Sequence, residues 1–585
     1  MIHRDNEAQG KTNRRVAMFN GKRLSGWMAL AVFATVGGAM VAAAPAFAKT
    51  DVDKLTISGE IRERYEIRNN AGFGTNRGGN PSASNSNLSI ASHRVRVGVG
   101  YDLTPDVSFF AQIADGRTFG SEGAAGNTAV TNAGGGANGI DLHQGYIQLK
   151  NVLIPGLSLK AGRQEIMFGD HRLLGNFGWS QNGNAFDGVR LTQSGQAADV
   201  DLFWIRTVDS CSTGAVGNAL NCASSGAAPF PGGAAAGTAG TSGTFGTRNQ
   251  DLYGLYVTLK PVKNWTIEPY YILLADSRAA NPNQIGTGAA ATAITTAQYT
   301  NQSRNFLGGR INGNAGVAGM KWDFTYEGNY QFGGAMSNCQ RASGTVAACG
   351  RNDANTSSAA GLASGHDLRI NATQQVVKTG LTFENVPMKP RLGFEFDYAS
   401  GDRCANGVAD AGRGSNNNAC SSQNHRQTGL ADNLFPTNHF HYGYMDMMAW
   451  KNMVNYQIMF DVKPSPVSKL QFNYTIHRLA RTADNWYRGN QAVYAVSTTT
   501  NQEASLGQEL NVHYWHTFKE KFKFEIGYGH FFAGAYLDKS ANSNTNGPQG
   551  GFAGASTING TANAALSQTT VVGQDWGYLM GSILF

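Results

Sequence analysis

The sequence predicts an all-β protein: a transmembrane antiparallel β-barrel of about 18 strands, with short periplasmic turns and long extracellular loops. Three observations lead to this fold class. Hydrophobic and polar residues alternate along many short segments, the N-terminus has the pattern of an export signal, and WGYLMGSILF (576–585) reads as an amphipathic last strand that ends in Phe585. The composition agrees, since the 585 residues include 74 glycines and only 15% are charged, which is unusual for a soluble globular protein.

Alternation is the main evidence for strands. In residues 55–68, LTISGEIRERYEIR, Leu, Ile and Tyr share one parity and most charged residues share the other. A period of two places these two sets on opposite faces of a strand. The pattern recurs in RVRVGVGYDL (94–103), MKWDFTYEGNYQF (320–332), PRLGFEFDY (390–398), LQFNYTIH (470–477) and KFKFEIGYG (521–529).

About 18 such segments follow one another along the chain. Very short turns join some of them, and long stretches rich in Gly, Asn and Ser join others, which is typical of an outer-membrane barrel. A soluble β-sandwich or β-helix is the alternative, but the charge-dense polar faces argue against the first and the lack of a short sequence repeat against the second. The segments begin near residues 54, 92, 106, 140, 156, 186, 198, 250, 264, 303, 316, 367, 389, 450, 468, 506, 521 and 570.

Residues 1–48 are predicted to be a secretory signal peptide, which leaves 49–585 as the barrel. A basic region precedes the apolar run WMALAVFATVGGAMVAAA (27–44), and Ala46-Phe47-Ala48 fits a cleavage site. A membrane anchor is the alternative, because 18 apolar residues are just long enough to span a bilayer. Met1 and Met18 are both candidate starts. We expect export to the outer membrane of a Gram-negative bacterium.

Charge and cysteine content exclude several other functions. Residues 1–48 hold six basic and two acidic residues, so the mature chain accounts for only +3 of the net +7, and no nucleic-acid partner is expected. The cysteines form three close pairs in an exported chain, which predicts three disulfides within loops. With no C-x-x-C or C-x-x-C-H motif, we expect no metal and no cofactor. The pairs are Cys211 with Cys222, Cys339 with Cys349, and Cys404 with Cys420.

The polar faces of the strands can line the interior of a barrel of this size, because about 18 strands enclose an aqueous lumen. Inward charges are then solvated or paired, and they influence which solutes pass. We expect a basic, water-exposed part of the lumen wall on one side of the barrel. Its residues are Arg62, Arg64, Arg94, Arg96 and Arg190, and Arg391 is also expected to face the lumen.

Three blocks of sequence resemble the alginate export porin family of the outer membrane. They are AGRQEIMFGDHRLLGNFGW (161–179) followed by FDGVRL (186–191), LFPTNHFHYGYMD (434–446), and GQELNVHYW with FEIGYGHFFAGAY within 507–536. The resemblance implies a monomeric barrel of 18 strands, and the type member exports an acidic polysaccharide through an electropositive lumen. It also implies that a charged network at the pore wall or its rim contains Arg163, Glu165, Asp170, Arg172, Asp187 and Arg190.

Arg163 does not fit this placement directly. Leu157, Leu159 and Ala161 define an outward parity that includes Arg163, and an arginine facing lipid at mid-depth costs about 2–4 kcal/mol. Either a bulge at Gly162 switches the parity, or Arg163 lies beyond the membrane.

The expected function is a channel for polar, anionic saccharides or polysaccharide. The alternatives are a general porin for sugars or small organic acids, and a barrel sheath around a periplasmic partner. The expected partners are outer-membrane lipid, including lipopolysaccharide, the saccharide solute and the barrel-insertion machinery. An enzyme is not expected, because the sequence has no G-x-S-x-G motif and no phosphate-binding loop. His439 and His441 alone make a weak metal motif.

Overall fold

The computed structural model describes residues 52–70, 87–119, 140–208, 250–276, 299–337, 367–403, 427–491, 493–495, 501–537 and 573–585. The predicted signal peptide and all six cysteines lie outside these ranges, so the export signal and the disulfides stay predictions. The barrel belongs to one compact unit, Lys54–Phe585.

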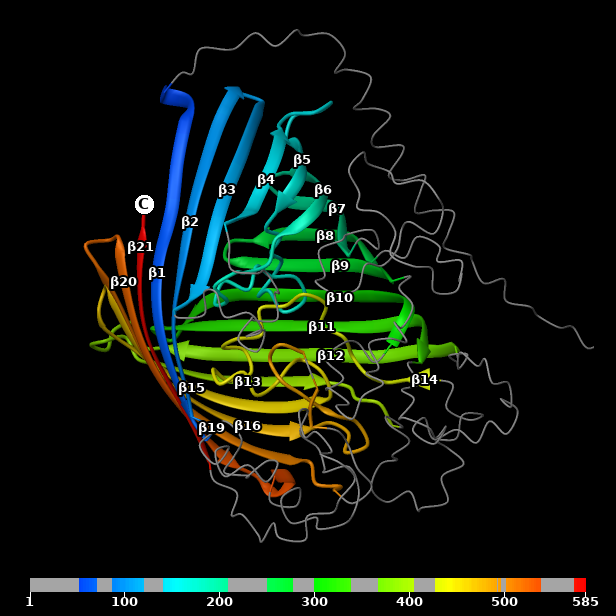
Figure 1. Cartoon of the computed structure of the whole chain (residues 1–585), viewed down its shortest axis with the longest axis vertical. Coiled ribbons are helices and arrows are strands. Elements are labelled where there is room, and N and C mark those ends of the chain that lie inside the picture. Colours follow the sequence, from blue (N-terminus) through cyan, green and yellow to red (C-terminus); the bar gives the residue numbers. More distant parts are fainter. Residues whose placement is uncertain are drawn as a thin grey trace, which may run out of the picture. The chain divides into compact units, whose positions relative to one another are not determined.

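Eighteen long antiparallel strands close into a barrel, as the alternation predicts (Figure 1). They are β1 (Leu55–Asn69), β2 (Leu88–Thr104), β3 (Val107–Thr118), β4 (Asp141–Leu149), β5 (Leu157–Gln164), β6 (Phe186–Ser194), β7 (Ala198–Val208), β8 (Gln250–Val262), β9 (Trp265–Asp276), β10 (Tyr299–Val317), β11 (Met320–Ser337), β12 (Asp367–Thr382), β13 (Arg391–Ala399), β15 (Met453–Ser465), β16 (Ser468–Leu479), β19 (Ser505–Phe518), β20 (Phe522–Ala533) and β21 (Gln574–Leu584).

The remaining described elements are short. A 3-10 turn, η1 (Val52–Lys54), precedes β1. The two residues of β14 (Gln427–Thr428) pair parallel with β12, and β17 (Trp486–Tyr487) pairs with β18 (Val493–Ala495). Within the described residues, no helix is long and apolar enough to cross a membrane.

The first and last strands close the barrel. β1 pairs antiparallel with β21 from Glu60 opposite Leu584 to Asn69 opposite Asp575, and Figure 1 shows β21 beside β1. At the end of this seam Gly59 N donates to Phe585 O at 2.8 Å, and Phe585 N donates to Gly59 O at 3.1 Å. Closure leaves no unpaired edge strand between β1 and β21.

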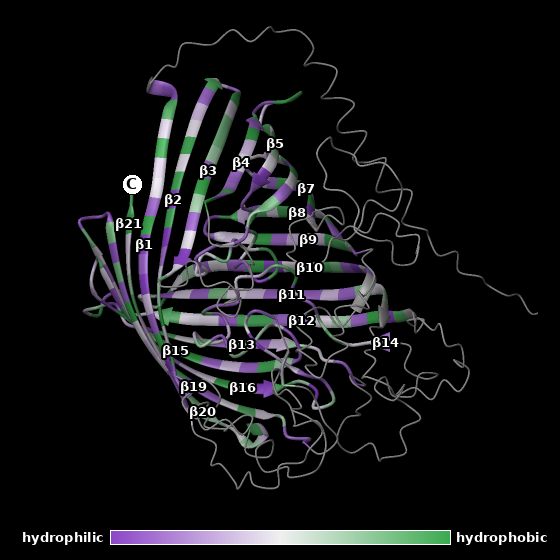
Figure 2. Cartoon of the chain, in the orientation of Figure 1, coloured by the Kyte–Doolittle hydropathy of each residue, from purple (hydrophilic) through white to green (hydrophobic). Residues whose placement is uncertain are grey.

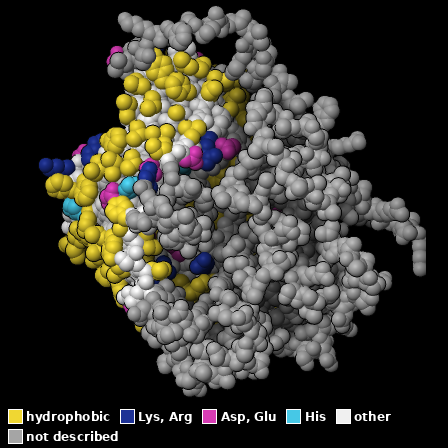
Figure 3. All heavy atoms as spheres, viewed as in Figure 1, with side chains coloured by type: hydrophobic (Ala, Val, Ile, Leu, Met, Phe, Trp, Pro, Cys, Tyr) yellow, Lys and Arg dark blue, Asp and Glu magenta, His cyan; other side chains and the backbone are white. Residues whose placement is uncertain are grey.

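The two faces of the strands have opposite character. On β1 the outward Ile57 and Tyr65 are 59% and 47% exposed, whereas the inward Arg62 and Arg64 are buried. Figure 2 shows the alternation along the strands, and Figure 3 shows hydrophobic side chains over much of the visible described surface. A soluble protein would place these side chains the other way round. An apolar outer face with a polar inner face is the arrangement of a membrane barrel.

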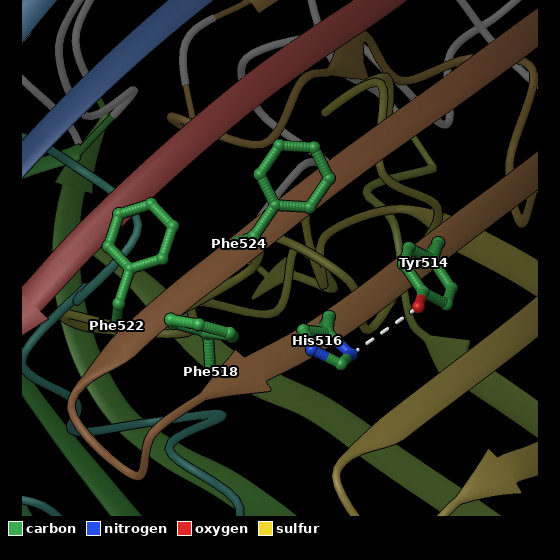
Figure 4. A pocket seen from close by; sticks show the side chains of 5 residues that line it. All are labelled: Tyr514, His516, Phe518, Phe522 and Phe524. Atoms are coloured by element: carbon green, nitrogen blue, oxygen red, sulfur yellow. Dashed lines mark hydrogen bonds between the residues drawn. The ribbon is translucent and has the colours of Figure 1, made fainter.

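Aromatic side chains gather on the outer face near the short turn between β19 and β20. They line a shallow groove of about 380 Å³. Figure 4 shows the five side chains on β19 and β20, with His516 and Tyr514 joined by a hydrogen bond of 3.5 Å. Rings at this height fit the aromatic girdle that flanks the apolar band of such barrels. The groove residues are Tyr514, His516, Phe518, Phe522 and Phe524.

Two segments between strands run inside the barrel, where their side chains reach opposite walls. Residues 165–185 follow β5, and residues 429–452 precede β15. They meet at a parallel bridge between Leu174 and Phe435, and His441 Nε2 lies 2.7 Å from Asp170 O. The sequence predicts only loops at these places. Their packing fills part of the lumen that the strand count alone would leave to water.

Candidate functional site: the barrel lumen

Four arginines on β1 and β2 form a row on the lumen wall. Arg62 is the register partner of Arg94, and the row continues to Arg64 on one strand and Arg96 on the other. All four are buried, with Arg94 only 2% exposed. The expectation of a water-exposed basic wall is therefore not what the geometry shows, because a chain segment covers these side chains.

The row holds the inward segment 165–185 by its backbone. Each arginine donates a hydrogen bond to a carbonyl oxygen between residues 178 and 182. Hydrogen bonds from charged donors are stronger than neutral ones, and four together fix the path of the segment along this wall. The bonds run from Arg62 to Gly178 (2.8 Å), Arg64 to Trp179 (2.6 Å), Arg94 to Ser180 (2.7 Å) and Arg96 to Asn182 (2.8 Å).

Carboxylates neutralise the same row. Glu60 lies between Arg62 and Arg94, at 2.9 and 2.6 Å, and Glu66 pairs with Arg64 at 2.8 Å. Buried charges are tolerated when they are paired in this way. On β1 the two arginines lie on the face opposite the exposed Ile57 and Tyr65, and parity alone does not reveal that the arginines of the row have carbonyl partners.

Glu165 links the inward segment to two strands. Its Oε1 accepts from Arg96 at 3.1 Å and lies 2.8 Å from His143 Nε2, and its Oε2 accepts from Asn176 at 3.1 Å. Burial alone would raise the pKa of Glu165, but the hydrogen bonds from His143 and Asn176 and the charge of Arg96 hold it below its usual value. Glu165 is therefore a carboxylate that positions the start of the segment.

Arg172 ties the same segment to the opposite wall. Its guanidinium pairs with Glu395 and, at 3.1 Å, with Asp397, both on β13. The cation also lies 5.3 Å from the ring of Tyr442 and 5.8 Å from that of Trp450, in the second inward segment. All three members of the ion-pair group are almost completely buried. This group joins both segments to the wall.

Asp170 makes a second connection to the strands. It pairs with Arg310 on β10 at 2.6 Å, and Arg310 also pairs with Glu268 on β9 at 2.8 Å. Burial acts to raise the pKa of Asp170, but the charges of Arg310 and Arg172 outweigh it and lower that pKa. Asp170 therefore stays ionised and bridges the segment to β10.

An aromatic stack lies between the two inward segments. The indole of Trp179 stacks on the ring of His439 with centroids 4.0 Å apart and planes 10° apart. The guanidinium of Arg64 lies over the Trp179 ring, 4.2 Å from its centroid. His439 Nδ1 lies 3.1 Å from Asp446. Within the described residues, no three His, Cys, Asp or Glu side chains are placed to hold a metal ion. His439 contacts Trp179 through its ring and Asp446 through Nδ1.

Arg163 and Asp187 lie on the outer face at the long-loop ends of β5 and β6, not on the lumen wall. Arg163 is in register with Asp187, and the pairing of β5 with β4 and β6 shows no shift at Gly162. Of the two alternatives for Arg163, a change of parity at Gly162 therefore does not occur, although Gly162 has a φ of +125°, and a position beyond the membrane is the alternative that is left. The two side chains pair with each other at 3.2 Å and are 37% and 61% exposed.

Arg190 and Arg391 face the lumen nearer the short turns. Arg190 on β6 pairs with Asp201 on β7 at 2.7 Å. Arg391 on β13 pairs with Asp323 at 2.6 Å and with Asp461 at 3.4 Å. In this part of the barrel both arginines are half-buried, and they donate to carboxylates and not to the carbonyl oxygens of residues 178–182.

The sequence reasoning missed Lys160 and Trp179. Lys160 lies opposite Arg190 in the register of β5 and β6, so it shares the lumen face. The signal was available, because Lys160 has the polar parity of LSLKAG (157–162). Trp179 lies in an aperiodic stretch, where no sequence pattern gives a direction for its side chain.

Comparison with known proteins identifies the family. The sequence model described as Alginate export matches residues 53–223 and 243–548. The chain belongs to the alginate export family. It is a β-barrel of the Gram-negative outer membrane, with the fold of a solute channel. No curated protein sequence matches the chain significantly.

Several solved structures are similar to the chain at very low identity. OccK8 (OprE) of Pseudomonas aeruginosa is 10% identical, covering 91% of this chain and 98% of that chain, with a TM-score of 0.47. OccAB1 of Acinetobacter baumannii is 11% identical, with 91% and 96% covered and a TM-score of 0.47. OprD of Pseudomonas aeruginosa is 10% identical, with 92% and 96% covered and a TM-score of 0.45.

Proposed function

We propose that this member of the alginate export family is an outer-membrane channel that passes polar, anionic saccharides or polysaccharide by diffusion through its charged lumen. The observation that carries the proposal is a set of lumen lysines without carboxylate partners. Within the described residues, Lys160 on β5, Lys321 on β11 and Lys523 on β20 form no ion pair, and their strand parity places them on the lumen face.

Most acids in the same half of the lumen are already neutralised. Glu525, Asp102 and Glu327 are inward acids there that have no ion pair among the described side chains, but Glu327 is buried at 5% exposure. Among the accessible groups of this set, the unpaired charge is therefore positive by a small margin, and accessible charges that have no partner are the ones a passing solute meets. The paired acids are Asp199, Asp201, Glu268, Asp323, Glu395 and Asp461.

Spacing of the lysines around the barrel suits transport. Each ammonium group offers a contact that a carboxylate can leave again, because water competes for it. Conduction requires contacts that are favourable and yet weak and multiple. Lys321 and Lys523 are each the second residue of a strand that follows a short turn, so an anionic chain meets them around the same end of the barrel. We propose that the barrel acts as a monomer in a membrane that contains lipopolysaccharide.

A general porin for sugars or small organic acids is the second candidate. The observation that favours it is the extent of pairing, since most lumen charges are neutralised by a neighbour. A wall of paired charges stays wet without a strong preference for the sign of the solute.

Reversal potentials in a planar bilayer distinguish the two functions. The full chain is measured in a KCl gradient, and then in the presence of alginate or of neutral dextran. We expect anion preference and block by alginate but not by dextran. Lys321→Gln with Lys523→Gln should reduce the anion preference, whereas Lys519→Gln, in the exposed turn after β19, should not. Cation preference, or equal block by both polymers, would contradict the anionic function.

A further inference from the structure

A row of alternating charges crosses four neighbouring strands on the outer face of the barrel. Arg163 on β5 is the register partner of Asp187 on β6. Asp187 also lies opposite Arg206 on β7, and Arg206 lies opposite Asp251 on β8. The three registers join in a single line, which we call the outer charge row. Adjacent strands are about 4.8 Å apart, so the two arginines lie about 10 Å from each other.

The outer charge row lies at the upper limit of the apolar band. Each member is within two residues of the long-loop end of its strand. From that end, the outward register pairs of β7 and β8 change from charged to aromatic to aliphatic. They are Arg206 with Asp251, Trp204 with Tyr253, and Leu202 with Leu255. Headgroups, aromatic girdle and hydrocarbon follow in this order at a membrane barrel, so the row is at headgroup level.

Both arginines of the row are accessible from outside the barrel. The side chains of Arg163 and Arg206 are 37% and 35% exposed. Among the described residues, Arg163 donates one hydrogen bond, from Nη1 to Asp187 at 3.2 Å. Arg206 donates from Nε to Asp251 at 3.0 Å and lies 5.5 Å from the ring centroid of Trp204. Exposed ion pairs add little stability, so stability alone does not account for the row.

The other end of the barrel has a different outer surface. At the short-turn ends of β19 and β20, the outer face carries the aromatic groove shown in Figure 4. The long loops of an outer-membrane barrel are extracellular and the short turns periplasmic. The outer charge row therefore meets the outer leaflet, where the lipid is lipopolysaccharide and its sugar headgroup is phosphorylated.

We propose that the outer charge row binds the phosphate groups of one lipopolysaccharide molecule, with Arg163 and Arg206 as the donors. A guanidinium can donate two parallel hydrogen bonds to a phosphate. Two arginines about 10 Å apart suit a lipid with two phosphates on its headgroup, and a phospholipid such as phosphatidylglycerol offers only one. The carboxylate of Asp187 lies between the arginines, so a phosphate competes with it for Arg163. This site does not depend on which solute the channel passes.

Native mass spectrometry of the full chain in detergent micelles measures lipid binding. Diphosphoryl lipid A, monophosphoryl lipid A and phosphatidylglycerol are titrated in the presence of EDTA, and a dissociation constant is determined for each. Diphosphoryl lipid A should bind most tightly. Arg163→Gln and Arg206→Gln should each weaken its binding about tenfold. Asp187→Asn should strengthen its binding, because the amide does not repel phosphate and competes less for Arg163.

Arg478→Gln is the matched control. Arg478 on β16 is exposed, has outward parity and lies one residue from the long-loop end of its strand, but it is outside the row. This variant should leave the affinity for diphosphoryl lipid A nearly unchanged. An equal loss in Arg478→Gln and in the row variants would refute a localised site and indicate diffuse surface charge.

The remaining outcomes test the ligand and the role of the ion pairs. Equally tight binding of phosphatidylglycerol, with equal losses in the row variants, would refute lipopolysaccharide as the ligand. Weaker binding by Asp187→Asn would mean that the row acts through its ion pairs and not as a phosphate site. Heat-modifiable migration in gels verifies that each variant is folded. Channel conductance should be unchanged in all of them, so failure of this proposal leaves the proposed function standing.

Discussion

At the scale of single residues, Arg172 has the most demanding position in the lumen. It is enclosed between Glu395 and Asp397 and is almost inaccessible to water. Removing one member of a buried ion-pair group leaves charges without compensation and typically costs about 3–5 kcal/mol. We therefore expect Arg172→Met to lower the free energy of unfolding by that amount, measured by urea titration of the barrel in detergent.

The control for this prediction is an arginine that is exposed. Arg488 is exposed; among the described residues its side chain donates to Asn490 at 3.2 Å and lies 5.9 Å from the ring centroid of Tyr494. Arg488→Met should therefore change the stability by less than about 0.5 kcal/mol. A loss of stability of equal size in both variants would show that the enclosed ion pairs do not hold the inward segments.

Asp484 should make the packing of residues 480–487 depend on pH. Burial and the nearby Asp402 raise the pKa of Asp484 to about 7, compared with about 3.9 in an unfolded chain. The folded state then keeps a proton that the unfolded state loses. The stabilising contribution is complete below about pH 4 and is lost as the pH rises through about 7.

Comparison of wild type with Asp484→Asn isolates this contribution. The amide cannot ionise, so the difference in melting temperature between the two proteins should shift in favour of the variant as the pH rises from about 5 to about 8. A difference that does not change with pH would mean that Asp484 is already ionised in the folded barrel.

At the scale of elements, the arginine row and the segment 165–185 act as one unit. Arg94 and Arg96 donate to Ser180 and Asn182, and the segment has no strand of its own to hold it here. Arg94→Glu with Arg96→Glu replaces these donors by acceptors that repel the carbonyls. We expect the segment to detach, with a larger and noisier conductance and new accessibility of a cysteine placed at Ser180.

A charge reversal elsewhere in the lumen provides the comparison. Lys321→Glu also makes the lumen charge more negative, as the double variant does. Among the described interactions, however, Lys321 makes no contact with the segment 165–185. It should change the reversal potential without the noise or the labelling at residue 180. Quiet conductance in the double variant would mean that other contacts, such as those of Arg172, suffice to hold the segment.

The strands and the inward segments differ in how far sequence predicts them. Each strand begins within a few residues of its predicted start, because a period of two is imposed wherever one face meets lipid and the other the lumen. Residues 165–185 and 429–452 have no such constraint. Their charges indicated a network, but its partners, such as Arg172 with Glu395, are more than 200 residues apart. No local pattern can specify contacts of that kind.

The same limit explains the residues whose surroundings differ from expectation. Parity placed Arg94 in the lumen, but it could not show that a folded-in segment buries it. For Arg163, of the two alternatives that the sequence left open, the change of parity at Gly162 is not found, and the side chain keeps its outward parity at the long-loop end of β5. Pairing with Asp187 at the end of the strands gives that arginine a partner on the outer face.

At the scale of the whole molecule, the seam between β1 and β21 decides whether the barrel is closed. A Cβ atom at Gly59 would lie 2.3 Å from Phe585 Cζ and 2.7 Å from Arg96 O. The ring could rotate away, but the backbone oxygen belongs to the neighbouring strand and cannot. Gly59→Val should therefore displace the last residue from its two hydrogen bonds with Gly59.

We expect Gly59→Val to lower the fraction of closed barrel several-fold, because a sheet with an unpaired edge exposes backbone groups that lipid cannot satisfy. Heat-modifiable migration in gels measures that fraction. Gly316→Val on β10 is the matched control, since a Cβ atom there would meet nothing within 4 Å. Deletion of Phe585 should resemble Gly59→Val if the terminal residue completes the seam. Normal closure in both of these variants, with Gly316→Val also normal, would place the determinant of closure in the paired strands between Glu60 and Asn69 instead.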